Sequence, residues 1–227
     1  PDYRVQHRWG EIKNPNGKGL TDREQSPKDA VKDAKSAILW VRAHADSLGI
    51  DPNRIAAGGG SAGGASAAAT GTLDKINPEG EDWSVSDRPA ALVLFNPVFD
   101  NGPDGYGFHR TKEYWKDFSP LHNINGKTPP TAVFLGTEDS IIPVATAKEY
   151  EKRMEEAEVR CELHLYEGQP HGFFNQYKFV ETMMEADKFL TSLGFLEEEE
   201  IAPQLLDFLQ DAEGGETLRL AVLRTLA

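Results

Sequence analysis

Uninterrupted apolar segments constrain the fold of this chain more than any other feature of its sequence. Residues 90–95 (AALVLF) and 131–135 (TAVFL) carry hardly any polar side chain. Such runs are typical of central strands in a parallel sheet, because helices cover both faces of that sheet. A further strand is predicted at residues 161–166, and helical patterns extend over residues 143–157 and 177–193. The alternation predicts an α/β fold with a mostly parallel sheet flanked by helices.

A long amphipathic helix is predicted ahead of these strands. Ser26 and Pro27 are a favourable N-cap and first helical residue, and Gly49 is a suitable C-cap. Apolar residues recur between them at intervals of three and four, as expected for one buried face. These residues are Val31, Ala34, Ile38, Val41, Ala45 and Leu48. In the helix predicted at 143–157, the inward residues are expected to be Ala147, Tyr150 and Met154.

A run of glycines lies between a predicted strand at residues 54–57 and a predicted helix at residues 65–72. Within it, residues 59–63 (GGSAG) match the G-x-S-x-G pattern of a nucleophile elbow, in which a tight turn raises a serine hydroxyl above the sheet. Ser61 is therefore a candidate nucleophile, and the start of the helix would favour an anion beside it. Because glycine-rich loops are common, the alternative is a turn with a structural role alone.

The same glycines also fit the G-x-G-x-x-G pattern of a dinucleotide-binding turn, at positions 58, 60 and 63. That function requires an acidic residue at the end of a second strand, about 20 residues further on. The acidic residues nearest to this spacing are Glu79, Glu81 and Asp82. They lie in a polar segment that no strand pattern precedes, so a dinucleotide-binding domain is the less favoured interpretation.

A serine nucleophile requires a base that accepts its proton and an acid that orients this base. Asp139 and His171 each follow a predicted strand by a few residues, as Ser61 does. The carboxyl ends of parallel strands meet at one edge of an α/β sheet, where such sheets place their sites. We therefore expect Ser61, His171 and Asp139 to act as nucleophile, general base and orienting acid.

Other residues compete for two of these roles. Glu138 is adjacent to Asp139 and is an alternative acid, since the sequence does not tell which carboxyl group is turned toward the site. For His171 the alternative is a structural role. The other histidines are weaker candidates, because none of them follows a strand end in a loop flanked by Gly and Pro. They are His7, His44, His109, His122 and His164.

The composition argues against several other functions. There are 24 Lys and Arg against 37 Asp and Glu, a net charge of −13, and the basic residues are interleaved with acidic ones, so nucleic acid is not an expected partner. Cys161 is the single cysteine, which excludes an intramolecular disulfide and a multi-cysteine metal cluster. No apolar run approaches the ~18 residues of a membrane span. The compartment stays open between cytoplasmic and secreted.

Two segments depart from the alternation of strands and helices. Residues 96–130 are rich in glycine and aromatic residues and long for a connection, so they either cover a site or form an irregular insertion with its own aromatic core. Residues 197–227 are acidic and Leu-rich, with short amphipathic patterns at 201–209 and 218–226. We expect a main domain at 1–196 and a helical extension at 197–227 that serves docking or dimerisation into a homo-oligomer.

Together, these segments resemble the α/β-hydrolase superfamily, specifically its bacterial acetyl-esterase branch related to hormone-sensitive lipase. The similarity extends from about residue 2 to residue 196. The segments that carry it are YR at 3–4, DA at 33–34, WVR at 40–42, GIDPNRI at 49–55, GSAGG at 60–64, GTED at 136–139 and PHGF at 170–173. The resemblance implies Ser61 as nucleophile, His171 as general base, Asp139 as orienting acid and the Ala62 N–H as an oxyanion donor. It implies no cofactor and no metal.

The function expected from this resemblance is that of a serine carboxylesterase. Its substrates would be small-molecule or carbohydrate esters with short acyl groups, acetyl above all, cleaved through an acyl-enzyme. A serine peptidase of the same superfamily is a nearby alternative. An assay that compares the hydrolysis of amide and ester substrates would distinguish the two.

One departure from the family pattern leads to a second hypothesis. The first residue is Pro1, and the family's H-G-G-G oxyanion loop and first three strands would precede it. The third of those strands lies between the fourth and fifth, so a gap is expected in the sheet, filled by a missing N-terminal segment or another chain. Because loss of one oxyanion donor costs about 10²–10³ in rate, the chain would be an impaired hydrolase or a non-catalytic interaction domain.

Overall fold

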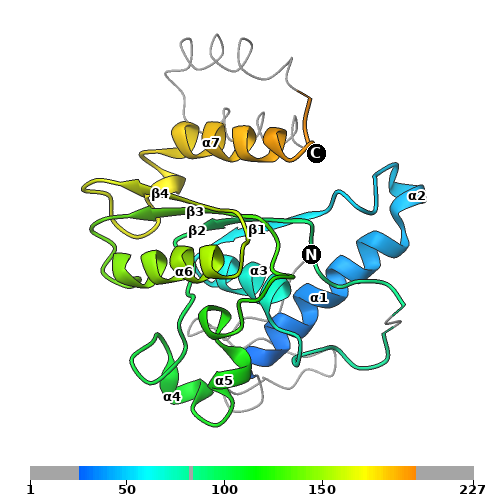
Figure 1. The fold of residues 1–227 in the computed structure, drawn as a ribbon, viewed down its shortest axis with the longest axis horizontal. Helices are drawn as coiled ribbons and strands as arrows, with labels where there is room; N and C mark the ends of the chain where they lie inside the picture. The colour runs from blue at the N-terminus through cyan, green and yellow to red at the C-terminus, as the bar shows by residue number, and fades with distance from the viewer. Residues whose placement is uncertain (1–25, 82–83, 198–227) are drawn as a thin grey trace, which may run out of the picture. The chain divides into compact units, whose positions relative to one another are not determined.

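The computed structural model describes residues 26–81 and 84–197 (Figure 1). The chain divides into two compact units, residues 1–186 and 187–227. Within the first unit, strands and helices alternate along the chain as the sequence predicts. Of the second unit, the structure describes the last turns of helix α7 and the residues up to 197, where Gly194 adopts a left-handed conformation after the helix.

A four-stranded sheet forms the centre of the described fold. Its strands are β1 (Ala56–Gly60), β2 (Ala91–Phe95), β3 (Thr131–Gly136) and β4 (Cys161–Tyr166). They pair in the order β1-β2-β3-β4, and every pair is parallel. The prediction of a mostly parallel sheet is therefore confirmed, as are the strands at 90–95, 131–135 and 161–166 to within one residue.

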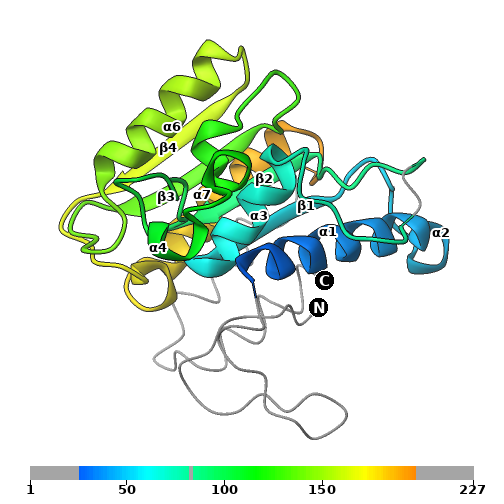
Figure 2. The same cartoon turned by 90° about the horizontal axis from the view of Figure 1, so that it is seen from below.

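Seven α-helices lie in the described residues around the strands. They are α1 (Pro27–Ala43), α2 (Ala45–Leu48), α3 (Ala62–Thr72), α4 (Phe108–Thr111), α5 (Trp115–Phe118), α6 (Val144–Glu156) and α7 (Phe179–Ser192), with 3-10 turns at Pro120–His122 and Phe173–Asn175. Seen from below in Figure 2, α3 lies between α6 and α1 on one side of the sheet. Among these described helices, none has the length and apolarity needed to cross a membrane.

The main core lies between the sheet and the helices α3 and α6. Alternate residues of β2 and β3 enter it, and α6 contributes the three inward residues that the sequence predicts. These core residues include Leu92, Leu94, Val133, Leu135, Ala147, Tyr150 and Met154. The other side chains of the two strands are buried too, except for the half-buried Phe95, which stacks on Phe134 at 4.8 Å between ring centroids. Both faces of the central strands are thus covered, which explains their unbroken apolar sequence.

The first predicted helix differs from the expectation in two respects. It is interrupted at His44, whose backbone leaves the helical conformation at φ −106° and ψ +13°, so α1 and α2 are separate helices. Gly49 caps α2 at φ +68°, as predicted, but Leu48 is 47% exposed rather than buried. Instead, Lys35 is buried, with an exposed fraction of 2%. Its ammonium group finds polar partners inside the fold, which the apolar spacing does not reveal.

The strand before the glycine run also differs. It covers Ala56–Gly60 rather than residues 54–57, so the glycines belong to the strand and pair with β2 up to Gly60 and Phe95. A Cβ atom on Gly58 would lie 2.8 Å from the Val93 carbonyl oxygen. Close approach of the backbones thus requires glycine here and overrides its low strand propensity.

The segment 96–130 packs some of its aromatic residues onto the main body of the fold, whereas Tyr106 is exposed. Phe99 stacks on Tyr150 of α6 at 3.7 Å between centroids, and Phe118 joins a second cluster with residues of α1 and α3. Several predictions lie outside the described residues. They concern the YR segment at 3–4, the sheet gap beside it, His7, Asp82 and the helices expected at 201–209 and 218–226.

Candidate active site

Ser61 occupies a sharp turn between β1 and α3. Its backbone has φ +53° and ψ −115°, a conformation that is rare outside glycine and costs about 1–3 kcal/mol. The Ser61 N–H donates to the Phe95 carbonyl oxygen at 2.8 Å, which anchors the turn to the end of β2. A Cβ atom on Gly59 would lie 2.7 Å from the Gly63 backbone carbon. The turn therefore fits only because glycine stands at position 59.

The structure brings Ser61, His171 and Asp139 together in one hydrogen-bonded row. His171 Nε2 lies 2.9 Å from Ser61 Oγ, and His171 Nδ1 lies 2.7 Å from Asp139 Oδ2. Because a carboxylate accepts hydrogen bonds and does not donate them, Nδ1 carries the proton and Nε2 accepts from the serine hydroxyl. This geometry allows the imidazole to take a proton from Ser61.

Asp139 is held from both of its oxygen atoms. Its Oδ1 accepts the backbone N–H groups of Ile141 and Ile142 at 2.8 and 2.9 Å, and its side chain has an exposed fraction of 0%. The neighbouring Glu138, the alternative acid, is exposed. Between these two carboxyl groups, only that of Asp139 contacts the imidazole among the interactions of the described residues.

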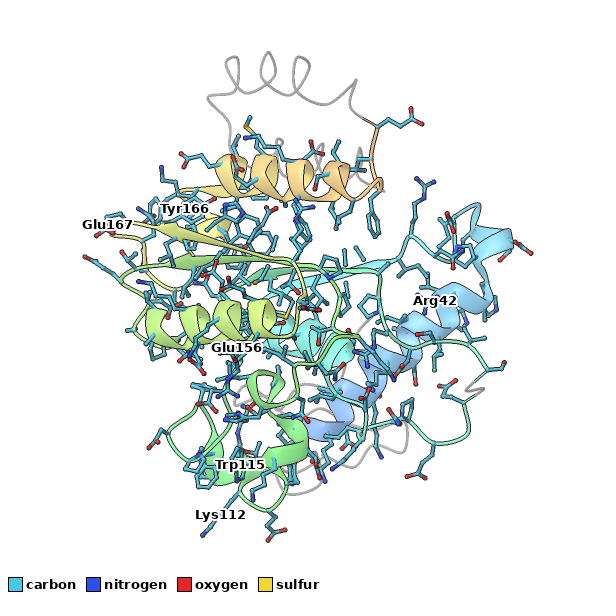
Figure 3. All side chains as sticks on the ribbon, in the orientation of Figure 1. Arg42, Lys112, Trp115, Glu156, Tyr166 and Glu167 are labelled. Carbon is cyan, nitrogen blue, oxygen red and sulfur yellow. The ribbon has the colours of Figure 1, made fainter. Side chains whose placement is uncertain are left out.

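His171 lies in a loop after β4, whose end is marked by Tyr166 and Glu167 in Figure 3. Two features fix this loop against the end of β3. Glu138 N–H donates to the Gln169 carbonyl oxygen at 3.0 Å, and a Cβ atom on Gly136 would collide with that same oxygen. The residue after the histidine, Gly172, has φ +80°, a conformation that favours glycine.

A fourth polar residue at this edge of the sheet, Asn96, was not identified from the sequence. It follows β2 directly, and its side-chain Nδ2 donates to Asp139 Oδ2 at 2.8 Å. Its Oδ1 accepts the Gly172 N–H at 3.2 Å. The available signal was positional: each of the four strands is followed by a polar residue at the same edge, but a lone asparagine fits no motif.

The Ala62 N–H, the expected oxyanion donor, lies at the first residue of α3. The first four N–H groups of a helix have no partner inside the helix, so this donor is available to an anion near Ser61. The residue is exposed. Within the described part of the chain, no group of three or more His, Cys, Asp or Glu side chains is arranged to hold a metal ion.

The other described histidines lie elsewhere. His44 stacks on Trp40, and His109 is exposed on α4. His164 of β4 stacks on Phe134 of β3. His122 lies 2.9 Å from Ser119 Oγ. Burial lowers the pKa of His122, and the nearby carboxylate of Asp100 opposes that shift.

Of the acidic residues of the dinucleotide alternative, Glu79 and Glu81 lie in the loop after α3. Glu81 accepts a hydrogen bond from Ser36, and Glu79 is an exposed residue 3.6 Å from Lys32. Both carboxylates therefore contact side chains of α1. Such contacts are typical of surface residues that attach a loop to a neighbouring helix.

Comparison with known proteins relates this chain to hydrolases and esterases. Residues 20–92 match the BD-FAE family, and residues 106–197 match the dienelactone hydrolase family. Esterase LipC of Mycobacterium tuberculosis is 30% identical over 164 residues, which are 63% of this chain and 40% of LipC. The chain thus spans less than half the length of this curated relative.

Solved structures of esterase 2 from Thermogutta terrifontis are also similar. The propionate-bound form is 39% identical with a TM-score of 0.71, over 76% of this chain and 68% of that one. The form phosphorylated by paraoxon is 37% identical with a TM-score of 0.72, over 86% and 70% of the two chains. The ranges matched by the two family models include Ser61, Asp139 and His171. This chain belongs to the α/β-hydrolase superfamily, on the branch that contains these carboxylic ester hydrolases.

Proposed function

We propose that this chain is a serine carboxylesterase that hydrolyses esters of short acyl groups. The observation that carries the proposal is the row of contacts from Ser61 Oγ through His171 to Asp139, with distances of 2.9 and 2.7 Å. In such a row the imidazole acts as general base toward the hydroxyl, and the carboxylate keeps the imidazole in the required orientation. The relationship to known esterases supports the same chemistry.

The first half of the reaction forms an acyl-enzyme. Ser61 Oγ attacks the ester carbonyl carbon while His171 Nε2 takes the hydroxyl proton. The oxygen of the resulting tetrahedral intermediate is negatively charged, and the Ala62 N–H at the start of α3 stabilises it. When the intermediate collapses, the bond to the alcohol breaks, and the leaving oxygen receives the proton from His171.

The second half releases the acid. Water attacks the acyl carbon of the Ser61 ester, and His171 accepts a proton from that water. A second oxyanion forms at the same donor, and its collapse returns the proton to Ser61 Oγ and frees the carboxylic acid. His171 thus begins and ends the cycle neutral, with its Nδ1 proton toward Asp139 throughout.

The acyl group is proposed to be short. Propionate bound to the related Thermogutta esterase supports this size class. A carbohydrate as the alcohol, with acetyl as the acyl group, is proposed from the resemblance to acetyl esterases alone. Hydrolysis rates for p-nitrophenyl esters from acetate to decanoate, and for an acetylated xylose compared with free alkyl acetates, test the two parts separately.

The test of the mechanism is covalent labelling of the folded chain by a fluorophosphonate, mapped by mass spectrometry. The related esterase phosphorylated by paraoxon supports the use of an organophosphorus probe. We expect modification at Ser61 in the wild type. The control is Ser66→Ala, one turn further along α3, where the wild-type hydroxyl donates to the Ala62 carbonyl oxygen. This variant should be labelled at Ser61 like the wild type. We expect no modification of Ser61→Ala and a slow one of His171→Ala.

Two outcomes would contradict the proposal. One is a folded wild-type chain that takes up no label and hydrolyses no ester, which would favour the impaired or non-catalytic alternative. The other is hydrolysis of anilide substrates as fast as of matched esters, which would favour a peptidase.

A further inference from the structure

Asn96 connects the two loops that carry the acid and the base of the proposed site. Its side chain has an exposed fraction of 0%. On one side, Nδ2 donates to Asp139 Oδ2 at 2.8 Å, and on the other side Oδ1 accepts the Gly172 N–H at 3.2 Å. A single buried amide group therefore bonds the loop after β3 and the loop after β4 at once.

The partners of this side chain require a carboxamide. A carboxylate oxygen needs a donor, and a backbone N–H needs an acceptor. Asn96 offers one of each from a single planar group, which also fixes its orientation. A leucine of similar size would leave both partners unsatisfied in a buried place, where each unsatisfied polar group is costly. An ionised aspartate would satisfy Gly172 and repel Asp139.

The backbone of Asn96 aims the side chain at these partners. Its φ is +44°, in the left-handed region where asparagine is one of the few tolerated residues besides glycine. Its N–H donates to the Phe134 carbonyl oxygen at 2.9 Å, which extends the pairing of β2 and β3 by one residue. The chain therefore turns out of the sheet at Asn96 while its backbone stays hydrogen-bonded to β3.

Asp139 Oδ2 is the oxygen that both Asn96 and His171 contact, at 2.8 and 2.7 Å. The other oxygen, Oδ1, is bound by the two N–H groups at 141 and 142. With donors on both oxygens, rotation of the carboxylate about its Cβ–Cγ bond breaks hydrogen bonds at either end. The lone pair that faces His171 Nδ1 is thus held in place by the amide of Asn96.

We propose that Asn96 is a positioning residue of the esterase site, which fixes the Asp139 carboxylate and the His171 loop relative to each other. The expected effect of Asn96 on kcat rests on the proposed function. Its role in fixing the carboxylate and the loop rests on the hydrogen bonds alone. Asn96 does not touch the reacting atoms, so its effect passes through the orientation of the imidazole.

Asn96→Gly removes the amide without straining a backbone at positive φ. We expect kcat to fall by about 10- to 100-fold, the range that corresponds to a lost hydrogen bond to a charged group, with KM changed less than about twofold. The matched control is Asn101→Ala, a buried asparagine in the same segment that donates to the Tyr106 carbonyl oxygen, away from the site. It should keep wild-type kcat at a similar loss of thermal stability.

Asn96→Asp keeps the shape and adds a titratable group. Two adjacent carboxyl groups share one proton at the acidic end of the working range, and the protonated one then donates to its neighbour as the amide does. The groups that face this pair are His171 and the backbone N–H groups already named. We expect the activity of this variant to be within a few fold of wild type at low pH and to fall relative to wild type as the pH rises.

Unchanged kcat in Asn96→Gly, or a loss equal to that of Asn101→Ala, would overturn the inference. So would an Asn96→Asp variant whose activity relative to wild type is equally low at every pH, a result that can be read even if the glycine variant does not fold. If the wild type hydrolyses no ester, the proposed function is wrong, but the positioning role of Asn96 can still be tested. The role of Asn96 is then read from the NMR signal of the His171 Nδ1 proton, which should move upfield or broaden in Asn96→Asp at high pH; an unchanged signal would overturn it.

Discussion

His171 Nε2 lies 2.9 Å from Ser61 Oγ, although 110 residues separate the two in the chain. Ser61 follows β1 and His171 follows β4, and the strands β2 and β3 lie between these two in the sheet. The loop after β4 must therefore return across the ends of two strands to reach the serine. Asp139, in the loop after β3, lies along that path. Its carboxylate binds the imidazole on the side opposite to Ser61.

Replacing Asp139 by Asn should inactivate the site while preserving its shape. The carboxylate accepts four N–H donors, two on each oxygen, so an amide at this position turns its own NH₂ group against two of them. We expect kcat for p-nitrophenyl acetate to fall by about 10⁴, the loss measured for the equivalent change in a known serine protease. Glu138→Gln, at the exposed neighbour, is the control and should keep nearly full activity. Equal losses in the two variants would transfer the role of acid to Glu138.

Lys35 should be important for stability and Lys32, on the same helix, should not. The Lys35 ammonium group is buried and contacts the Leu73 carbonyl oxygen at 2.5 Å and the Asp87 carboxylate at 2.8 Å. Lys35→Met leaves these partners unsatisfied, and we expect a loss of about 3–5 kcal/mol in the free energy of unfolding. For Lys32→Met, whose partner Glu79 is exposed, the expected change is about 0–1 kcal/mol. Urea denaturation of both variants measures the difference, and similar midpoints would contradict it.

The glycine at position 59 should tolerate a methyl group less well than its neighbour. A Cβ atom on Gly59 would lie 2.7 Å from the Gly63 backbone carbon, which cannot move without displacing the start of α3. At Gly60 the obstacle is the tip of the Phe174 ring, which can rotate away. We expect Gly59→Ala to lose about 1–3 kcal/mol of stability and most of the esterase activity. Gly60→Ala should keep more of both, and the reverse order would contradict this account of the elbow.

Cys161 should react slowly with alkylating reagents in the folded chain. Burial, with smaller contributions from Glu151 and Glu162, raises the pKa of its thiol to about 12. Since the thiolate is the reactive form, only about one thiol in 10⁴ is reactive at pH 8. Mass spectrometry after iodoacetamide treatment should show a rate at least about 100-fold lower in buffer than in urea. Equal rates in the two conditions would show that this end of β4 opens freely.

The central strands and α6 are predictable from the sequence because local patterns of apolar residues indicate which of their side chains are buried. Leu92, Leu94 and Val133 lie in unbroken apolar runs, and Tyr150 and Met154 recur at helical spacing. Ser61, Asp139 and His171 are predictable as neighbours for a related reason: each follows a parallel strand, and all such strand ends share one edge. Their catalytic roles remain the proposal made above.

The remaining features depend on contacts between distant segments. Lys35 is buried because Leu73, Asn77 and Asp87 supply its partners, and nothing within its own helix signals them. The glycines of β1 form a strand because Val93 approaches their backbone closely. Asn96 belongs to no motif, and its importance follows only from the two loops that meet it. In each case a tertiary contact overrides the local propensity of the residue.

The pairing order of the sheet has a consequence for refolding. Ser61, Asn96, Asp139 and His171 follow β1, β2, β3 and β4 in turn, so each strand contributes one residue of the site. All three strand pairings must be complete and in register before the four side chains meet. Such nonlocal parallel pairings form slowly, because each closes a long loop. Recovery of hydrolysis after dilution from denaturant should therefore trail recovery of helical circular dichroism, which makes activity a late reporter of sheet assembly.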